Sequence, residues 1–187
     1  MSQSDVRDVQ HATLGGGCFW CLEAVFSRTQ GVIQAISGYA NGHHPAPTYE
    51  EVCTGQTGHA EVVQITFDAT RISFPELLDI FFTIHDPTTL NRQGNDVGTQ
   101  YRSGIYTHDE GQARMAGVHL QALREAKAYG GARIVTEVVP LSHFHPAEPE
   151  HQRYFKHHPT AGYCAFVVAP KVAKFQQRFP ALDRGDD

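Results

Sequence analysis

The sequence predicts an α+β fold: a two-layer sandwich with a mixed sheet and a ferredoxin-like core, formed by one domain over residues 1–187. Three observations support this class. Segments with strand periodicity and segments with helix periodicity alternate, but without the strict cadence of a doubly wound parallel sheet. No internal repeat or low-complexity tract interrupts them. The length suits a single domain that buries roughly two-thirds of the surface its unfolded chain would expose.

The first elements are two short strands on either side of a helix. Residues 9–14 and 32–37 have strand character, and three glycines introduce a helix that runs from Cys18 to about Ser27. Residues 38–60 are rich in Gly, Pro, Asn and Thr and indicate a long loop. Because loops of this length in compact domains are usually functional, we expect this loop to contribute to a site.

Residues 61–67, EVVQITF, alternate in the manner of a half-buried strand. Val63, Ile65 and Phe67 share the apolar face, and Glu61 has the same parity. Two interpretations follow. Glu61 either lies in solvent at the start of the strand, which is more common for a carboxylate, or it is buried on the apolar face. In the second case desolvation would raise its pKa and let it carry a proton at neutral pH.

The next helix is predicted by its N-terminal residues. Ser73 and Glu76 have the spacing of a capping box, with Pro75 in the first turn, and the helix extends to about His85. The elements expected after a polar loop are a strand near 102–107, a helix over 109–129, a strand over 133–139, and a short helix around 147–158.

Composition excludes several functional classes. The formal net charge of −5 argues against nucleic acid or an anionic membrane surface as the main partner. The N-terminal residues lack the pattern of a secretory signal, and no stretch approaches about 18 continuous apolar residues. We therefore expect a cytoplasmic protein that binds neither nucleic acid nor membranes.

The four cysteines, Cys18, Cys21, Cys53 and Cys164, are too few and too scattered for a disulfide scaffold. Cys18 follows glycines and begins a helix, where unpaired backbone N–H groups and the positive end of the dipole favour a thiolate. This position suits a nucleophile, although Cys18 could also be a small buried apolar residue. The Cys-x-x-Cys spacing alone leaves open a general dithiol-disulfide oxidoreductase that uses Cys18 and Cys21.

The chain's twelve histidines invite a metal interpretation. However, the sequence contains neither a second Cys-x-x-Cys pair at zinc-finger spacing nor a His-Glu-x-x-His motif. We therefore expect no metal site. The histidines considered are His43, His44, His143, His145, His151, His157 and His158.

An ordered set of motifs resembles the A-type peptide methionine sulfoxide reductases over about residues 12–166. They are GGGCFW, GYANG, PTYEEVCTGQTGHAEVV, FFTIHDPTT, RQGNDVGTQYRS, AEPEHQRY and GYC. A single short motif would be weak evidence, but this set in the family's order is specific. Residues 167–187 would then form a C-terminal extension, and we expect its charged end to be disordered.

The resemblance implies a monomeric enzyme without metal or organic cofactor. It would reduce the S epimer of methionine sulfoxide, free or in proteins, with an external dithiol such as thioredoxin as reductant. The implied roles are Cys18 as nucleophile, Phe19 and Trp20 as the apolar pocket for the substrate methyl group, Tyr49 and Glu61 as polar groups facing the sulfoxide oxygen, Asp96, Tyr101 and Tyr163 as further substrate-binding residues, and Cys164 as resolving cysteine.

Elementary chemistry explains this combination of residues. A sulfoxide oxygen leaves poorly until it is protonated, so attack by Cys18 needs an acid, which Glu61 would supply with help from Tyr49 and Tyr101. The product, a Cys18 sulfenic acid, condenses with a second thiol to form a disulfide. An external dithiol then restores the enzyme by thiol-disulfide exchange.

Cys21 departs from the common family pattern, in which a residue such as Gly follows GCFW. Three residues after Cys18 on a helix, Cys21 is expected on the same side. It could resolve the sulfenic acid, receive the disulfide from Cys164, or have no role; we favour Cys164 as the first resolver. Without the resemblance, YCAFVV would indicate a strand with a buried cysteine. The resemblance implies no role for Cys53.

One further family-like segment, AEPEHQRY, contains Glu148, His151 and Tyr154. We expect these three residues to support the fold around the site and not to act as metal ligands.

Overall fold

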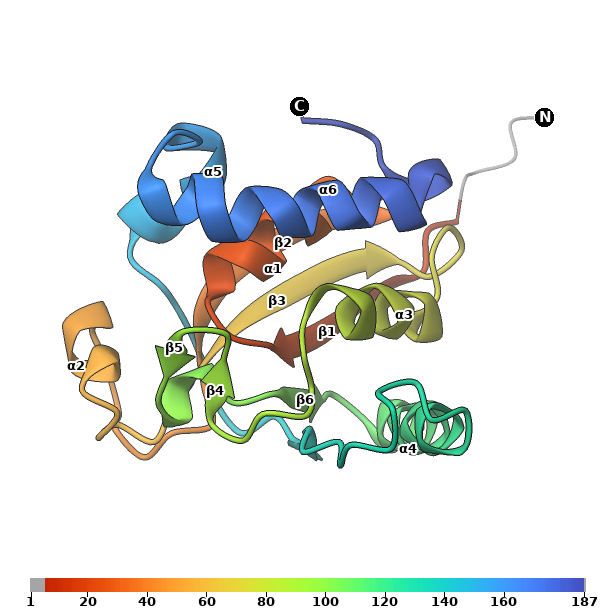
Figure 1. Cartoon of the computed structure of the whole chain (residues 1–187), viewed down its shortest axis with the longest axis horizontal. Coiled ribbons are helices and arrows are strands. Elements are labelled where there is room, and N and C mark those ends of the chain that lie inside the picture. The colour runs from red at the N-terminus through yellow and green to blue at the C-terminus, as the bar shows by residue number, and fades with distance from the viewer. Residues whose placement is uncertain (1–5, 187) are drawn as a thin grey trace.

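A six-stranded mixed sheet organises the structure, a computed structural model that describes residues 6–186 (Figure 1). Its strands lie in the order β7-β6-β1-β3-β2-β8, and every neighbouring pair is antiparallel except β6 with β7. The strands are β1 (Val9–Gly15), β2 (Val32–Ala40), β3 (Ala60–Asp68), β6 (Gly104–Thr107), β7 (Glu137–Pro140) and β8 (Phe144–Pro146), and a separate two-stranded sheet pairs β4 (Arg92–Gln93) with β5 (Asp96–Val97).

In the described part of the chain six α-helices accompany the strands: α1 (Phe19–Phe26), α2 (Tyr49–Cys53), α3 (Phe74–Ile84), α4 (Glu110–Glu125), α5 (Tyr154–His157) and α6 (Ala169–Arg178). The core runs β1-α1-β2-β3-α3-β6 along the chain, with the spatial order β6-β1-β3-β2. This is the ferredoxin-like arrangement, so the predicted α+β class with a mixed sheet is confirmed. Within residues 6–186 no helix has both the length and the apolarity needed to cross a membrane.

The main core lies between the sheet and the helices α1 and α3, and α6 packs across both helices (Figure 1). Nearly every residue of α1 is buried, as expected for a helix that is covered on all sides. Phe19, Leu22, Val25 and Phe26 are each at most 1% exposed. Burial of such a side chain stabilises a fold by about 1.5–3 kcal/mol. The helix that begins at Cys18 is therefore rigidly held.

The capping box predicted for α3 is confirmed. The Glu76 backbone N–H donates to Ser73 Oγ at 3.2 Å, and the Ser73 N–H donates to Glu76 Oε2 at 2.7 Å. A second capping box, Thr48 with Glu51, starts α2 inside the segment predicted to be a loop. That helix has only five residues, so its apolar periodicity is too short to detect in the sequence.

Several predicted boundaries differ from the structure, and the helix predicted around 147–158 is reduced to a 3-10 turn at Pro149–His151 and the short α5. The helix over 109–129 ends as α4 at Glu125, because Lys127 turns to a positive φ of 49° and breaks the helical path before the two glycines. The strand over 133–139 is confined to β7, which starts at Glu137. Its pairing with β6 begins at Gly104, so the preceding residues have no partner strand.

The C-terminal region is helical where the sequence alone indicated a strand. Cys164–Val168 forms a π-helix that continues directly into α6. Val172 and Phe175 are buried, so this extension packs against the rest of the fold. Arg28 binds Asp183 at 2.8 Å and Asp186 at 3.2 Å. Of the end predicted to be disordered, residues 183–186 are therefore described with contacts, while 187 lies outside the described residues.

Candidate active site

The Gly-rich turn between β1 and α1 presents Cys18 at the start of the helix. Gly17 has a φ of 93°, and a Cβ at that position would lie 2.6 Å from the side chain of Gln93. Only glycine fits both the backbone conformation and this close approach. Cys18 is the N-cap of α1 and remains partly exposed, as expected for a nucleophile.

The Cys18 and Cys21 thiols form a hydrogen-bonded pair, and their pKa values shift in opposite directions. Burial raises the pKa of Cys18 well above its ordinary value, and the hydrogen bond to Cys21 and the charge of Glu61 raise it further. The hydrogen bond from Cys18 is the main cause that lowers the pKa of Cys21. These opposite shifts make Cys21 the more acidic thiol of the pair and oppose the thiolate predicted at Cys18.

Glu61 occupies the buried position, not the exposed one. It lies near the start of β3, is 1% exposed, and its Oε2 accepts the Phe19 backbone N–H at 3.1 Å. Burial raises its pKa to about 8. Glu61 is thus mainly protonated at neutral pH and can act as an acid beside Cys18.

Tyr49 and Tyr101 supply neutral hydroxyl groups to the same site. Burial is the main cause that raises the pKa of each phenol, and the charges of Glu61 and Cys18 raise both further. Both side chains therefore remain O–H donors at physiological pH. Their shared electrostatic coupling to Glu61 and Cys18 shows that the structure gathers these four predicted residues.

A set of stacked aromatic rings forms one side of the site. Trp20 lies on Tyr154 with ring centroids 3.8 Å apart and planes 8° apart, and Tyr49 lies 4.1 Å from His151. Phe19 is fully buried and packs within 6.3 Å of Tyr49, so it supports the aromatic wall from behind. The rings of His151 and Tyr154 contact this wall, in agreement with a supporting role.

Tyr39 is a residue of the site that the sequence analysis missed. Its hydroxyl donates to Glu148 Oε1 at 2.9 Å, and Glu148 Oε2 accepts the Tyr49 backbone N–H at 3.0 Å. Tyr39 also pairs with Glu61 across strands β2 and β3. This pairing depends on sheet register, which no motif in the sequence reveals.

The other side of Cys18 is a cavity of about 170 Å³ whose lining includes the Cys18 and Cys21 thiols. It is lined by Cys18, Cys21, Gln93, Gly94, Asn95, Asp96, Tyr163, Val167 and Lys171. The Tyr163 hydroxyl donates to Asp96, which fixes both predicted residues at this wall. Lys171 was missed by the sequence analysis because it lies in the extension beyond the family-like motifs.

The predicted resolving cysteine lies behind this cavity. Cys164 is fully buried at the start of the π-helix and is not among the residues that line the cavity. Burial raises its pKa, and the neighbouring charge of Cys21 raises it further. Cys21 therefore lies in contact with Cys18 on one side and interacts with Cys164 on the other. Cys53 is exposed, and its thiol interacts with Tyr49.

One group of possible metal ligands is found among residues 6–186. Atoms of Glu148, Glu150 and His151 lie within 4.8 Å of one another. Both carboxylate oxygens of Glu148 already accept hydrogen bonds, from Tyr39 and from Tyr49. Glu148 therefore serves to hold the aromatic side of the site together.

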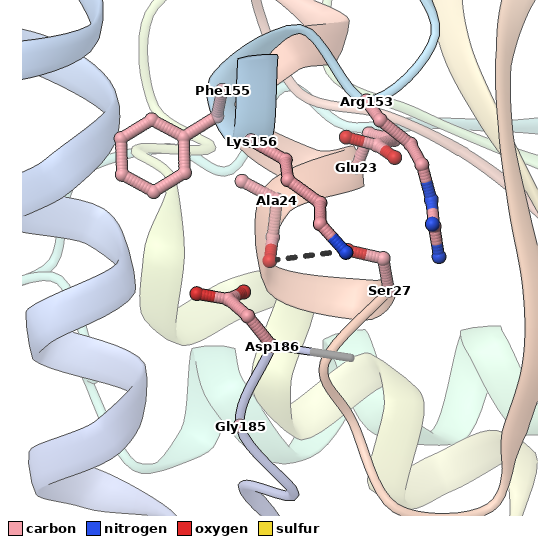
Figure 2. Close-up of a pocket in the computed structure, with 8 residues that line it drawn as sticks. All are labelled: Glu23, Ala24, Ser27, Arg153, Phe155, Lys156, Gly185 and Asp186. Carbon is pink, nitrogen blue, oxygen red and sulfur yellow. Dashed lines mark hydrogen bonds between the residues drawn. The ribbon is translucent and has the colours of Figure 1, made fainter. Parts of the chain in front are cut away.

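Figure 2 shows a separate small cavity further along α1, lined by Glu23, Ala24, Ser27, Arg153, Phe155, Lys156, Gly185 and Asp186. Its volume of about 20 Å³ has room for about one water molecule. Burial raises the pKa of Glu23 to about 7, and the nearby Arg153 opposes this rise. None of the predicted site residues lines this cavity.

A sequence model of the protein family described as peptide methionine sulfoxide reductase matches residues 10–182 of this chain. The chain belongs to this family. A relative named peptide methionine sulfoxide reductase MsrA, from Polynucleobacter asymbioticus, is 54% identical over 97% of this chain and 95% of its own length. Membership makes the protein a thiol-dependent oxidoreductase that acts on sulfur groups.

Solved structures of the same family share the fold. Reduced Mxr1 from Saccharomyces cerevisiae superposes with a TM-score of 0.78 at 34% identity, covering 88% of this chain and 95% of that one. Mxr1 in complex with Trx2 gives a TM-score of 0.56 at 26% identity, covering 82% and 92%. The reduced form of Mxr1 is therefore more similar in structure to this chain than Mxr1 in the Trx2 complex is.

Proposed function

We propose that this family member reduces the S epimer of methionine sulfoxide, free or in proteins, to methionine, and so repairs oxidised proteins. The observation that carries the proposal is the buried, protonated Glu61 beside the partly exposed Cys18. A nucleophilic sulfur and a carboxylic acid at one site match the two needs of sulfoxide reduction, which are attack on sulfur and protonation of oxygen.

In the first step the Cys18 sulfur attacks the sulfoxide sulfur. Glu61 donates a proton to the sulfoxide oxygen, and the hydroxyls of Tyr49 and Tyr101 stabilise the developing charge on that oxygen. The sulfoxide S–O bond breaks as the oxygen passes to Cys18, which becomes a sulfenic acid, while methionine leaves and the proton of the Cys18 thiol restores Glu61. The substrate methyl group packs against Trp20, with Phe19 behind it; Asp96 and Tyr163 form the polar wall.

In the second step a thiol replaces the oxygen on Cys18. The sequence favours Cys164 for this role, but the hydrogen bond between Cys18 and Cys21 supports the other order. We therefore propose that Cys21 resolves the sulfenic acid first and that Cys164, which interacts with Cys21, receives the disulfide afterwards.

The last step restores the thiols by exchange with an external dithiol. The complex of the relative Mxr1 with Trx2 supports thioredoxin as the reductant. The chemistry uses only protein groups, so neither a metal nor an organic cofactor enters the proposed cycle. The proposal treats the chain as one catalytic domain, because the extension packs on α1 and α3. It also takes the protein to be a monomer of the cytoplasm.

A general dithiol-disulfide oxidoreductase that uses only Cys18 and Cys21 is the alternative activity. The buried Glu61 disfavours it, because thiol-disulfide exchange needs no acid that protonates an oxygen. The two activities also differ in substrate, since the alternative acts on protein disulfides.

A stereospecific turnover assay tests the proposal. The purified protein is given methionine S-sulfoxide or R-sulfoxide, with thioredoxin or with dithiothreitol, and methionine is quantified. Turnover of the S epimer alone is expected with either reductant. Equal turnover of both epimers, or disulfide reduction without sulfoxide reduction, would contradict it. Cys53→Ser serves as the matched cysteine control.

A further inference from the structure

Among residues 6–186, Lys171 is the only residue with a positive side chain that lines the cavity beside Cys18 and Cys21. It lies in the first turn of α6 and is half-buried. Across residues 6–186, no carboxylate comes within ion-pair distance of its ammonium group. This charge is therefore available to the thiols of the cavity.

Lys171 differs in charge from the other groups that face Cys21. The ionisable side chains around the Cys21 thiol come from α1, β3, β5, the π-helix with its N-cap, and α6. They are Cys18, Glu61, Asp96, Tyr163, Cys164 and Lys171. All except Lys171 are neutral or negative. Lys171 is thus the single group whose charge attracts a thiolate at this position.

The importance of this charge increases after the first chemical step. In the resting pair the hydrogen bond from Cys18 is the main stabiliser of a Cys21 thiolate, and Lys171 adds to it. Once Cys18 is a sulfenic acid, its thiol hydrogen is gone. The Tyr163 hydroxyl donates to Asp96. Lys171 then remains as the positive charge that lowers the pKa of Cys21, beside the neutral Tyr163 hydroxyl, which also hydrogen-bonds to this thiol.

We propose that Lys171 is a positioning residue for the resolving step, because its ammonium group holds Cys21 as the thiolate that attacks the sulfenic acid on Cys18. The proposal rests on the function and the resolving order proposed above. The Cys21 sulfur forms a bond to the Cys18 sulfur and is oxidised, while the Cys18 sulfur is reduced as its S–O bond breaks. The departing hydroxide takes the proton that Cys21 released, so the products are one disulfide and one water molecule.

Two measurements test the proposal, beginning with the ionisation of Cys21 alone. In a Cys18→Ser, Cys53→Ser, Cys164→Ser background Cys21 is the only thiol, and its ultraviolet thiolate absorbance is followed against pH. Lys171→Met is expected to raise the midpoint by about one pH unit, which lowers the thiolate fraction about tenfold. Lys171→Arg should restore the midpoint. An unchanged midpoint in Lys171→Met would overturn the proposal.

The second measurement uses the chain with its natural cysteines. After a single addition of methionine S-sulfoxide at neutral pH, quenched samples are analysed by mass spectrometry for methionine, sulfenic acid and mapped disulfides. Lys171→Met should slow formation of the Cys18–Cys21 disulfide about tenfold and leave the methionine burst unchanged. Lys174→Met, one turn along α6 and absent from the cavity lining, is the matched control with parental rates.

The outcomes separate this proposal from the one on which it rests. Absence of a methionine burst in the parent would refute the proposed function. A burst followed by a Cys18–Cys164 disulfide would refute the resolving order and, with it, the role of Lys171. A normal burst with Cys18–Cys21 formation at the parental rate in Lys171→Met would refute the role of Lys171 alone.

Discussion

The two sides of Cys18 are built on different principles. The aromatic side is a set of stacked rings from α1, α2 and the 148–158 segment, fixed by hydrogen bonds to Glu148. The thiol side is a cavity between α1, the β4–β5 hairpin, and the π-helix with α6. In the proposed function the first side holds the substrate methyl group in place, whereas the second must let sulfur atoms exchange partners.

This difference teaches how one nucleophile can serve two partners in turn. Cys18 lies at the boundary, with Glu61 on β3 behind it. In the proposed cycle the aromatic rings and Glu61 govern the loss of oxygen from the substrate, and Cys21 with Lys171 governs the loss of oxygen from Cys18. Substitutions on the two sides should therefore affect different steps of one cycle.

The largest effect is expected at the boundary itself. Cys18→Ser replaces the sulfur nucleophile by a hydroxyl and should lower kcat/KM by at least about a thousandfold, with either reductant. Methionine formation from the S-sulfoxide is the measurement. Turnover near the parental rate would show that Cys18 is not the nucleophile between the two sides.

Glu61→Gln should produce the next largest loss, about a hundredfold or more in kcat, because the amide cannot donate a proton to the sulfoxide oxygen. In the parent the acid form is lost as pH rises through about 8, so activity should decline over that range. The Gln variant should lack this decline. A pH-rate profile for both proteins measures the effect, and an identical alkaline limb in Glu61→Gln would assign the acid role to another group.

Glu61 also predicts a difference in stability. Its raised pKa means that the folded state keeps a proton that the unfolded state releases, so stability falls as pH rises from the ordinary carboxyl pKa towards about 8. Glu61→Gln should unfold at higher denaturant concentration than the parent at pH values above this range. Equal midpoints across the whole pH range would contradict the assigned burial cost.

The thiol side should show a smaller and more selective loss. Cys21→Ser should keep the single-turnover yield of methionine but lower thioredoxin-dependent turnover by about tenfold or more, because the sulfenic acid lacks its adjacent thiol. Cys164→Ser should lose less. The ratio of steady-state to single-turnover rates measures this contrast, and the reverse ranking would restore Cys164 as first resolver.

The aromatic side should show the smallest effect. Tyr154→Leu removes the ring stacked on Trp20, an interaction worth about 0.5–1.5 kcal/mol. The KM for methionine S-sulfoxide should rise severalfold, while the KM for thioredoxin stays constant. A change in the thioredoxin KM instead would mean that the two sides are not separate.

Much of the fold follows from local patterns in the sequence. The alternation of residues 61–67 predicts β3 and gives Glu61 the parity of its apolar face without deciding whether it is buried, and the Ser73 capping box predicts α3. The CAFVV run misleads, because a short apolar run suits a strand and a buried helix equally well. Packing of α6 against α1 and α3 decides in favour of the helix.

The residues of the site also divide into those that the sequence predicts and those that only tertiary packing reveals. The glycines before Cys18 and the parity of Glu61 can be read from the residues themselves, and the family resemblance adds Asp96 and Tyr163. Tyr39 and Lys171 could not be predicted, because each reaches the site only through tertiary contacts. Tyr39 depends on the register of β2 and β3, and Lys171 depends on how α6 packs.

The stacking of Trp20 gives the enzyme a built-in optical reporter. Trp20 is the only tryptophan of the chain, and it lies between the two cysteines of the Cys18–Cys21 pair in the sequence. Its emission therefore comes from one place, in ring contact with Tyr154 and Tyr163. Sulfenic acid and disulfide formation should each alter that emission, so every chemical state can be timed without an attached label.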